Sequence, residues 1–163
     1  MAGLQNYKDL YGSQQWQEIN KCFACGQNNP IGLRLSIKHK DDICYTTFTP
    51  KPEHSGWLNV MHGGLLSTIM DEVMAHWLWS RGTPAMTVEM TVRYLKPVPI
   101  GEPIVVTARQ QVDRGRIANM EAEVTLADGT QVARATAKFI KTERGLQIAS
   151  GRSATDTQEE AQE

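Results

Sequence analysis

The sequence lacks an excess of charge of either sign. Its 163 residues include 17 lysines and arginines against 18 aspartates and glutamates, which gives a formal net charge of −1. A chain with this balance has no general attraction for nucleic acid or for anionic membrane surfaces. We therefore expect neither nucleic acid nor a membrane among its partners.

Cysteines and long apolar runs are also scarce. The three cysteines are an odd number, which argues against a disulfide framework and fits a reducing compartment. No apolar run approaches the roughly 20 residues that a transmembrane helix needs. Residues 1–20 are too polar for a signal peptide. Together these absences predict a cytoplasmic protein.

The length of the chain is that of one domain with a single core. We expect this domain over residues 22–141, preceded by an N-terminal extension over residues 1–21 with a weak helical pattern. Polar residues dominate from about Thr142, so residues 142–163 are predicted to form a disordered tail.

Most of the expected domain alternates apolar and polar residues, as half-buried strands do. The first such segment is 33–37, followed by a hairpin turn at Asp41-Asp42 and a returning strand over 43–48. Gly115 and Asp128-Gly129 mark later turns. The same alternation predicts four further strands, over residues 86–94, 104–112, 118–126 and 133–139.

A different pattern stands between the early and late strands, where residues 64–80 predict one long helix. This segment is apolar nearly all round, and Gly82 and Pro84 end it. A helix of this kind must be largely buried, so an antiparallel sheet has to wrap around it. The sequence thus predicts an α+β domain.

One acid interrupts the apolar helix. Asp71 lies between Met70 and Met74, and burying a carboxylate is costly unless it is paired or used. Helical spacing places it in a stripe of small and polar residues that faces either another backbone or a ligand. That stripe comprises Gly64, Ser67 or Thr68, Asp71 and Ala75.

The next residue, Glu72, falls on a different face of the helix, four positions before His76. Residues four apart are neighbours on a helix surface. We interpret Glu72 as a structural partner of His76 or as a solvent-facing acid.

His62-Gly63-Gly64 stands at the expected start of the helix. Two glycines let a substrate approach the backbone, and the first-turn N–H groups have no partner inside the helix. Aimed at a carbonyl oxygen, with the positive end of the helix behind them, such groups form an oxyanion hole. The alternative is a tight turn that only begins the helix.

These motifs resemble those of the hotdog thioesterases of the phenylacetate-pathway type. His62-Gly63-Gly64, six intervening residues and Asp71 are similar to the signature of that family, and residues 87–97 are similar to its following strand. The block from Cys22 to Leu33 resembles an N-terminal block of bacterial members. The resemblance covers residues 22–141 and implies the hotdog fold, an antiparallel sheet wrapped around one long central helix.

The family resemblance also implies an activity, the hydrolysis of acyl-CoA to CoA and a carboxylic acid without a cofactor. Asp71 would be the general base or nucleophile, and the Gly63 N–H would polarise the thioester carbonyl. His62 would shape the pocket, and Thr87 would position the water. The family further implies a homo-oligomer, a dimer or a dimer of dimers, whose active sites are shared between two chains.

The chain departs from the family at one position. Several characterised members carry an asparagine six residues before the histidine, where this chain has Gly56. Asn59 and His54 are the polar residues nearby, and with Gly64 we expect them to contact substrate. For the CoA phosphates, the resemblance suggests basic residues on or beside the late strands, namely Arg114, Arg116, Arg134, Lys138 and Lys141.

The pair Cys22-x-x-Cys25 has the spacing of half a zinc site, but a structural site needs four ligands and no second pair follows. Cys44, His39 and His54 are the residues that such a site would have to recruit. We interpret the pair as a packed turn and expect no metal.

Two alternatives to the thioesterase remain. One is a hotdog dehydratase that acts on hydroxyacyl thioesters, although the known dehydratases lack the His-Gly-Gly and Asp pattern. The other is a non-catalytic hotdog module that binds acyl-CoA.

Overall fold

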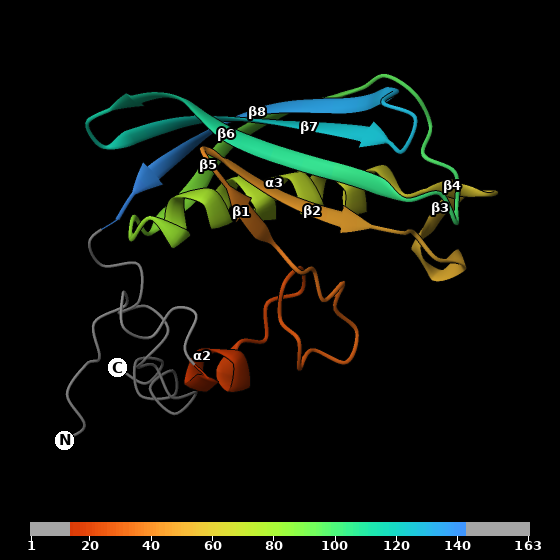
Figure 1. The fold of residues 1–163 in the computed structure, drawn as a ribbon, viewed down its shortest axis with the longest axis horizontal. Coiled ribbons are helices and arrows are strands. Elements are labelled where there is room, and N and C mark those ends of the chain that lie inside the picture. The colour runs from red at the N-terminus through yellow and green to blue at the C-terminus, as the bar shows by residue number, and fades with distance from the viewer. Residues whose placement is uncertain (1–13, 143–163) are drawn as a thin grey trace, which may run out of the picture.

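The computed structural model describes residues 14–142, so the predicted tail after Thr142 and most of the N-terminal extension lie outside the described residues. One long helix lies under a curved antiparallel sheet (Figure 1). The strands follow the order β1-β2-β6-β7-β8-β5. They are β1 Lys38–Lys40, β2 Ile43–Phe48, β5 Ala85–Tyr94, β6 Ile104–Arg114, β7 Ile117–Leu126 and β8 Gln131–Lys141.

Smaller elements complete the described chain. Helix α2 (Gln14–Ile19) precedes the sheet and is the short helix of the N-terminal extension. The 3-10 helix η1 (Pro52–His54) leads into a small hairpin formed by β3 (Ser55–Trp57) and β4 (Val60–Met61). This hairpin lies next to the start of the long helix, as Figure 1 shows.

The long helix α3 spans Gly63–Ser80, within one residue of its predicted bounds. Its N-cap is His62, whose backbone is extended and whose ring accepts a hydrogen bond from the first turn. Gly82, with φ at +70°, follows its C-terminus, a left-handed conformation that glycine adopts freely. Its buried side chains are Leu66, Ile69, Met70, Val73, Met74, Trp77 and Leu78.

The sheet curves over one side of α3, and part of the opposite side of the helix is only half-buried. Asp71 and Glu72 are half-buried on the side away from the core, as are Ser67 and Ala75. Residues of the turn around Cys22 pack there instead of a strand, since Cys22 lies against Glu72. Part of the helix surface is therefore left for a site.

The later strands and their turns follow the predicted alternation. Their inward residues are fully buried, as the pattern of β7 illustrates with Ala118, Met120 and Val124. Gly115 and Gly129 adopt positive φ at the two hairpins, where a side chain would be strained. These expectations are confirmed.

The expected first strand at 33–37 is wrong. The strand that pairs with β2 is β1, over Lys38–Lys40. The alternating residues before it bond to the cysteine turn instead, because Leu33 N–H donates to Phe23 O at 2.8 Å and Leu35 N–H donates to Ala24 O at 2.9 Å. Leu35 is buried there, so the alternation is real but serves a loop.

Strand β5 forms one edge of the sheet and has no further strand beside it among the described residues. Several of its apolar side chains are exposed, including Met86, Val88 and Tyr94. An edge with open hydrogen-bonding groups and apolar side chains is a surface that another chain can cover. Over residues 14–142 the structure contains no helix suited to crossing a membrane.

The packing of α3 against the sheet predicts the effect of a core truncation. Ile69 is completely buried, so Ile69→Ala should lower the free energy of unfolding by about 2–5 kcal/mol through lost apolar contacts and a residual cavity. Denaturant titration measures this. Ile31→Ala is the matched control because Ile31 is 79% exposed. An equal effect of both changes would contradict the assigned core.

Candidate active site

The carboxylate of Asp71 is held by a hydroxyl from the edge strand. Thr87 Oγ1 donates a hydrogen bond to Asp71 Oδ1 at 2.7 Å. Burial raises the pKa of Asp71 above its usual value, and the hydrogen bond from Thr87 opposes that rise. The carboxylate is thus oriented and desolvated, and a raised pKa makes it a stronger base.

A bulge in β5 accompanies this contact. The pairing of β5 with β8 shifts between Thr87 and Glu89, so that Val88 is left over. Bulges re-aim side chains and are common beside active sites. Here the irregularity begins at the residue whose hydroxyl meets Asp71.

At the start of α3 the two glycines have different environments. The Gly64 N–H donates to His62 Nδ1 at 2.9 Å and is occupied by this cap. The Gly63 N–H makes no hydrogen bond to any residue within 14–142. The pair of donors expected from the sequence is therefore reduced to one, Gly63, with His62 fixing the turn that presents it.

Tyr94 ties the same turn to β5. Its hydroxyl donates to Gly63 O at 2.9 Å and lies 2.5 Å from Ser67 Oγ. The sequence analysis missed this residue. The sequence offers only one signal for its role. Tyr94 is an aromatic residue with a hydroxyl, and it stands at the end of the strand that carries Thr87.

The other predicted substrate contacts take structural roles near His62. His54 Nδ1 accepts a hydrogen bond from Lys51 N at 2.9 Å, and His54 O accepts one from His62 N at 2.9 Å. Asn59 adopts φ of +59° between β3 and β4. A Cβ at Gly56 would fall 2.7 Å from His62 Cα, so His62 occupies the space that a side chain at Gly56 would need.

Asp71 and Gly63 belong to one helix but are far apart along it. They are eight positions apart in α3, which corresponds to about 12 Å of helix rise. A carbonyl oxygen bound at Gly63 and a water held by Asp71 must lie much closer than this to react. One chain alone therefore does not bring the two groups together.

Residues 58–133 match the model of the family described as the thioesterase superfamily. The described residues have the hotdog fold, which they share with solved structures of thioesterase-superfamily proteins. The predicted resemblance of the chain to hotdog thioesterases is thereby confirmed.

Named relatives agree with the hotdog assignment. Acyl-coenzyme A thioesterase 13 of Mus musculus is 41% identical over 58 residues, 34% of this chain and 41% of the mouse protein. The chain thus spans about two fifths of the curated relatives that it matches. The PaaI protein of the E. coli phenylacetic acid degradation operon aligns with a TM-score of 0.63 at 22% identity, covering 66% of this chain and 83% of PaaI.

A hypothetical thioesterase of Streptococcus pneumoniae with bound coenzyme A has the same fold. It aligns with a TM-score of 0.63 at 21% identity and covers 66% of this chain and 88% of its own. Two mutant structures of that protein carry alanine in place of an aspartate and of a threonine sixteen positions later.

Around the hotdog core, the predicted basic residues divide into paired and unpaired groups. Lys138 forms an ion pair with Glu89 at 2.9 Å, and Lys141 forms one with Asp113. Arg114 and Arg116, at the exposed tip between β6 and β7, form no ion pair within the described part of the chain. Arg134, on β8, forms no ion pair in this part of the chain either, so three of the predicted basic residues stay available to phosphate.

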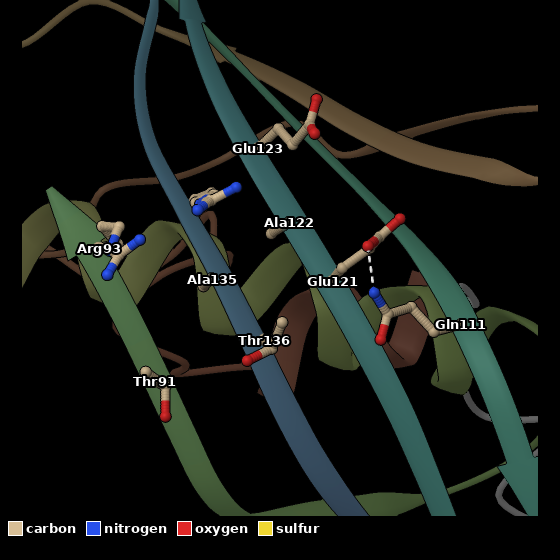
Figure 2. A pocket seen from close by; sticks show the side chains of 9 residues that line it. Thr91, Arg93, Gln111, Glu121, Ala122, Glu123, Ala135 and Thr136 are labelled. Atoms are coloured by element: carbon tan, nitrogen blue, oxygen red, sulfur yellow. Dashed lines mark hydrogen bonds between the residues drawn. The ribbon is translucent and has the colours of Figure 1, made fainter. Parts of the chain in front are cut away.

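The outer face of the sheet carries a hollow of about 380 Å³. Figure 2 shows Arg93, Gln111, Glu121 and Glu123 around it, with α3 behind the strands. Charges of both signs line the hollow, and it lies on the opposite side of the sheet from Asp71. It is therefore separate from the candidate active site.

The Cys22–Cys25 turn lies against α3 and meets Glu72. Cys22 Sγ is 3.6 Å from Glu72 Oε2. A hydrogen bond from the Cys25 side chain lowers the pKa of Cys22 to about 5, and the same contact raises the pKa of Cys25. Burial raises the pKa of Glu72 to about 7. Glu72 thus faces the cysteine pair, a contact that the sequence analysis missed because fifty residues separate it from Cys22.

The proposed recruits of a zinc site do not join this turn. His39 and Cys44 gather instead with His76, and Cys44 Sγ lies 3.2 Å from His39 Nδ1. Burial, with His39 nearby, lowers the pKa of His76 to about 4, and burial raises the pKa of Cys44 to about 12. This second cluster is therefore neutral at physiological pH.

The contacts of Tyr94 predict a local stabilising role. Tyr94→Phe removes the hydroxyl that joins Gly63 and Ser67, and the free energy of unfolding should fall by about 0.5–1.5 kcal/mol because the ring is half-exposed to competing water. Chemical denaturation measures the loss. Tyr45→Phe is the control, since the Tyr45 hydroxyl has no hydrogen bond to another described residue. A neutral Tyr94→Phe would remove the assigned role of the hydroxyl.

Proposed function

We propose that the protein is an acyl-CoA thioesterase, a hydrolase that converts acyl-CoA and water to free CoA and a carboxylic acid. The observation that carries the proposal is the half-buried Asp71 carboxylate, held at 2.7 Å by Thr87. Asp71 and Thr87 are sixteen positions apart, the same spacing as the two residues replaced in the pneumococcal thioesterase. The name of the mouse relative supports acyl-CoA as the substrate class.

In the proposed hydrolysis, the Asp71 carboxylate would activate a water molecule as a general base. The carboxylate takes a proton from a water held by Thr87, and the water oxygen adds to the thioester carbon while its carbonyl oxygen accepts from the Gly63 N–H. The carbon–sulfur bond then breaks, and the CoA thiolate takes the proton back from Asp71. In the nucleophilic route Asp71 attacks the carbon itself, CoA leaves, and water cleaves the resulting anhydride.

The separation of the two reacting groups supports a homo-oligomer, a dimer or a dimer of dimers. The carboxylate of Asp71 would work with Gly63 of the partner subunit, since about 12 Å of helix separates the two residues in one chain. The open edge of β5 and its exposed Met86 and Val88 support a second chain at this place.

The CoA phosphates would meet Arg114 and Arg116, two late-strand arginines that form no ion pair in the described chain and are exposed at a hairpin. Guanidinium groups bind phosphate through paired hydrogen bonds. The bound coenzyme A of the pneumococcal relative supports this ligand. The free state of all three cysteines supports a reducing compartment, the cytoplasm.

The decisive substitution is Asp71→Asn. It keeps the shape and most hydrogen bonding but removes the base, so kcat for acyl-CoA should fall by about 10²–10⁴-fold. The KM should change little, because the carboxylate acts mainly in the transition state. Thiol release from acyl-CoA measures the rate, and enoyl product in the same assay would identify a dehydratase instead.

Asp41→Asn is the matched control, since Asp41 is an exposed turn residue. Thr87→Val and Thr87→Ser test the positioning hydroxyl, and only the valine variant should lose activity. A folded Asp71→Asn protein within about fivefold of the parent kcat, well short of the loss of a positioned base, would end the catalytic assignment.

The shared site predicts complementation between two inactive chains. Gly63→Pro deletes the N–H at the first helical position, where proline is tolerated, and should lower kcat by about 10²–10³-fold. Mixing this variant with Asp71→Asn under conditions of subunit exchange should restore about a quarter of the parent activity, because half of the dimers are mixed and each has one intact site.

Gly63→Ala is the control for the carbon atoms that proline adds, because alanine keeps the N–H. Its Cβ would lie 3.4 Å from the Tyr94 ring, an ordinary contact distance. It should retain much more activity than Gly63→Pro. Light scattering on the same samples reports the oligomer. A fully active monomer, or mixtures that recover nothing while subunits exchange, would refute the shared site.

A further inference from the structure

The proposed hydrolysis leaves one cluster of reactive side chains unused, on the other flank of α3. Cys22, Cys25 and Glu72 each present a ligand atom there, and these atoms lie within 4.8 Å of one another. Two sulfurs and a carboxylate oxygen form a donor set that zinc accepts. The sequence alone showed only half of this set.

The spacing of the donor atoms fits a tetrahedral ion. With Zn–S of about 2.3 Å and Zn–O of about 2.0 Å, tetrahedral angles place a sulfur and an oxygen about 3.5 Å apart. The distance between Cys22 Sγ and Glu72 Oε2 is 3.6 Å. An ion would therefore fit between them with little movement of either side chain.

The turn that carries the two cysteines is firmly built. The Gly26 N–H donates to Cys22 O at 2.9 Å, and a Cβ at Gly26 would lie only 2.5 Å from that oxygen. The side chain of Asn20 bonds to both cysteines. Its Oδ1 accepts a hydrogen bond from Cys22 N at 2.9 Å, and its Nδ2 donates one to Cys25 Sγ at 3.4 Å. Both sulfurs are thus held in place before any ion binds.

The surroundings suit a cation. No lysine or arginine of residues 14–142 forms an ion pair with Glu72. A cavity of about 140 Å³ adjoins the three ligands and is also lined by Trp16, His76 and Trp79. This space is large enough for a water as the fourth ligand.

The cluster of His39, Cys44 and His76 is a weaker site for a cation. Arg81 lies close enough to lower the pKa of both His39 and Cys44 through its charge. The same positive charge opposes a metal ion there. We therefore expect the ion at the cluster of Cys22, Cys25 and Glu72, and substitutions in the two clusters separate these alternatives.

We propose that Cys22, Cys25 and Glu72 bind one zinc ion, with the fourth position open to the adjoining cavity. The ion would join the N-terminal turn to α3 at the residue next to Asp71. This revises the expectation of a metal-free turn, because the fold adds Glu72 to the cysteine pair. The site is separate from the acyl-CoA site, and its occupancy is measured without reference to activity.

Elemental analysis of protein expressed with added zinc and purified without chelator should find about one zinc per chain. Cobalt(II) added to stripped protein should give thiolate charge-transfer absorption and the strong visible bands of a tetrahedral ion. Cys22→Ser and Cys25→Ser should abolish both signals. Glu72→Gln keeps both thiols and the shape of the side chain, and it should weaken zinc binding at least about 10- to 100-fold, the loss seen even for outer partners of a metal site.

Cys44→Ser is the matched control and should keep its zinc and its cobalt spectrum. If a cysteine variant fails to fold, two measurements still test the proposed site: the cobalt spectrum of the parent protein and the zinc affinity of Glu72→Gln. Parent protein without stoichiometric zinc and without thiolate bands would overturn the proposal. So would zinc that survives Cys22→Ser but disappears in Cys44→Ser.

Discussion

The burial of one side of α3 under the curved sheet is the constraint on which the structure depends. Seven of its side chains fill the core, and this packing fixes the rotation of the helix about its axis. The rotation of α3 in turn decides which of its residues remain outside the core. Asp71 and Glu72 stay half-buried at the margin of the core, where a carboxylate is desolvated without being sealed off from a ligand.

The position of β5 at the edge of the sheet follows from the same arrangement. Thr87 and Tyr94 stand at opposite ends of this strand and meet α3 at Asp71 and at its first turn. One strand thus holds both halves of the candidate site on a rigid frame. The frame also keeps the halves apart, which is why the proposed hydrolysis would use the complementary half of a second chain.

The apolar pattern of the sequence predicted α3 and the later strands because each of these elements packs one face against the core. Apolar residues therefore recur along the sequence with the period of the helix or of the strand. The prediction failed at 33–37, where Leu35 is buried by the cysteine turn instead of by a sheet. Asp71 was predictable as an acid in an apolar run. The contacts of Gly56 with His62 and of Glu72 with Cys22 were not, because each depends on how distant segments pack.

Adjacent positions on a helix point about 100° apart, so Asp71 and Glu72 leave α3 in different directions. Asp71 turns toward β5 and a hydroxyl, and Glu72 turns toward the N-terminal turn and two sulfurs. A carboxylate beside two cysteine sulfurs completes a donor set that a cation such as zinc accepts, whereas a carboxylate beside a hydroxyl keeps a lone pair for water. The same functional group at consecutive positions is therefore suited to two chemistries, a metal ligand on one flank of the helix and a base on the other.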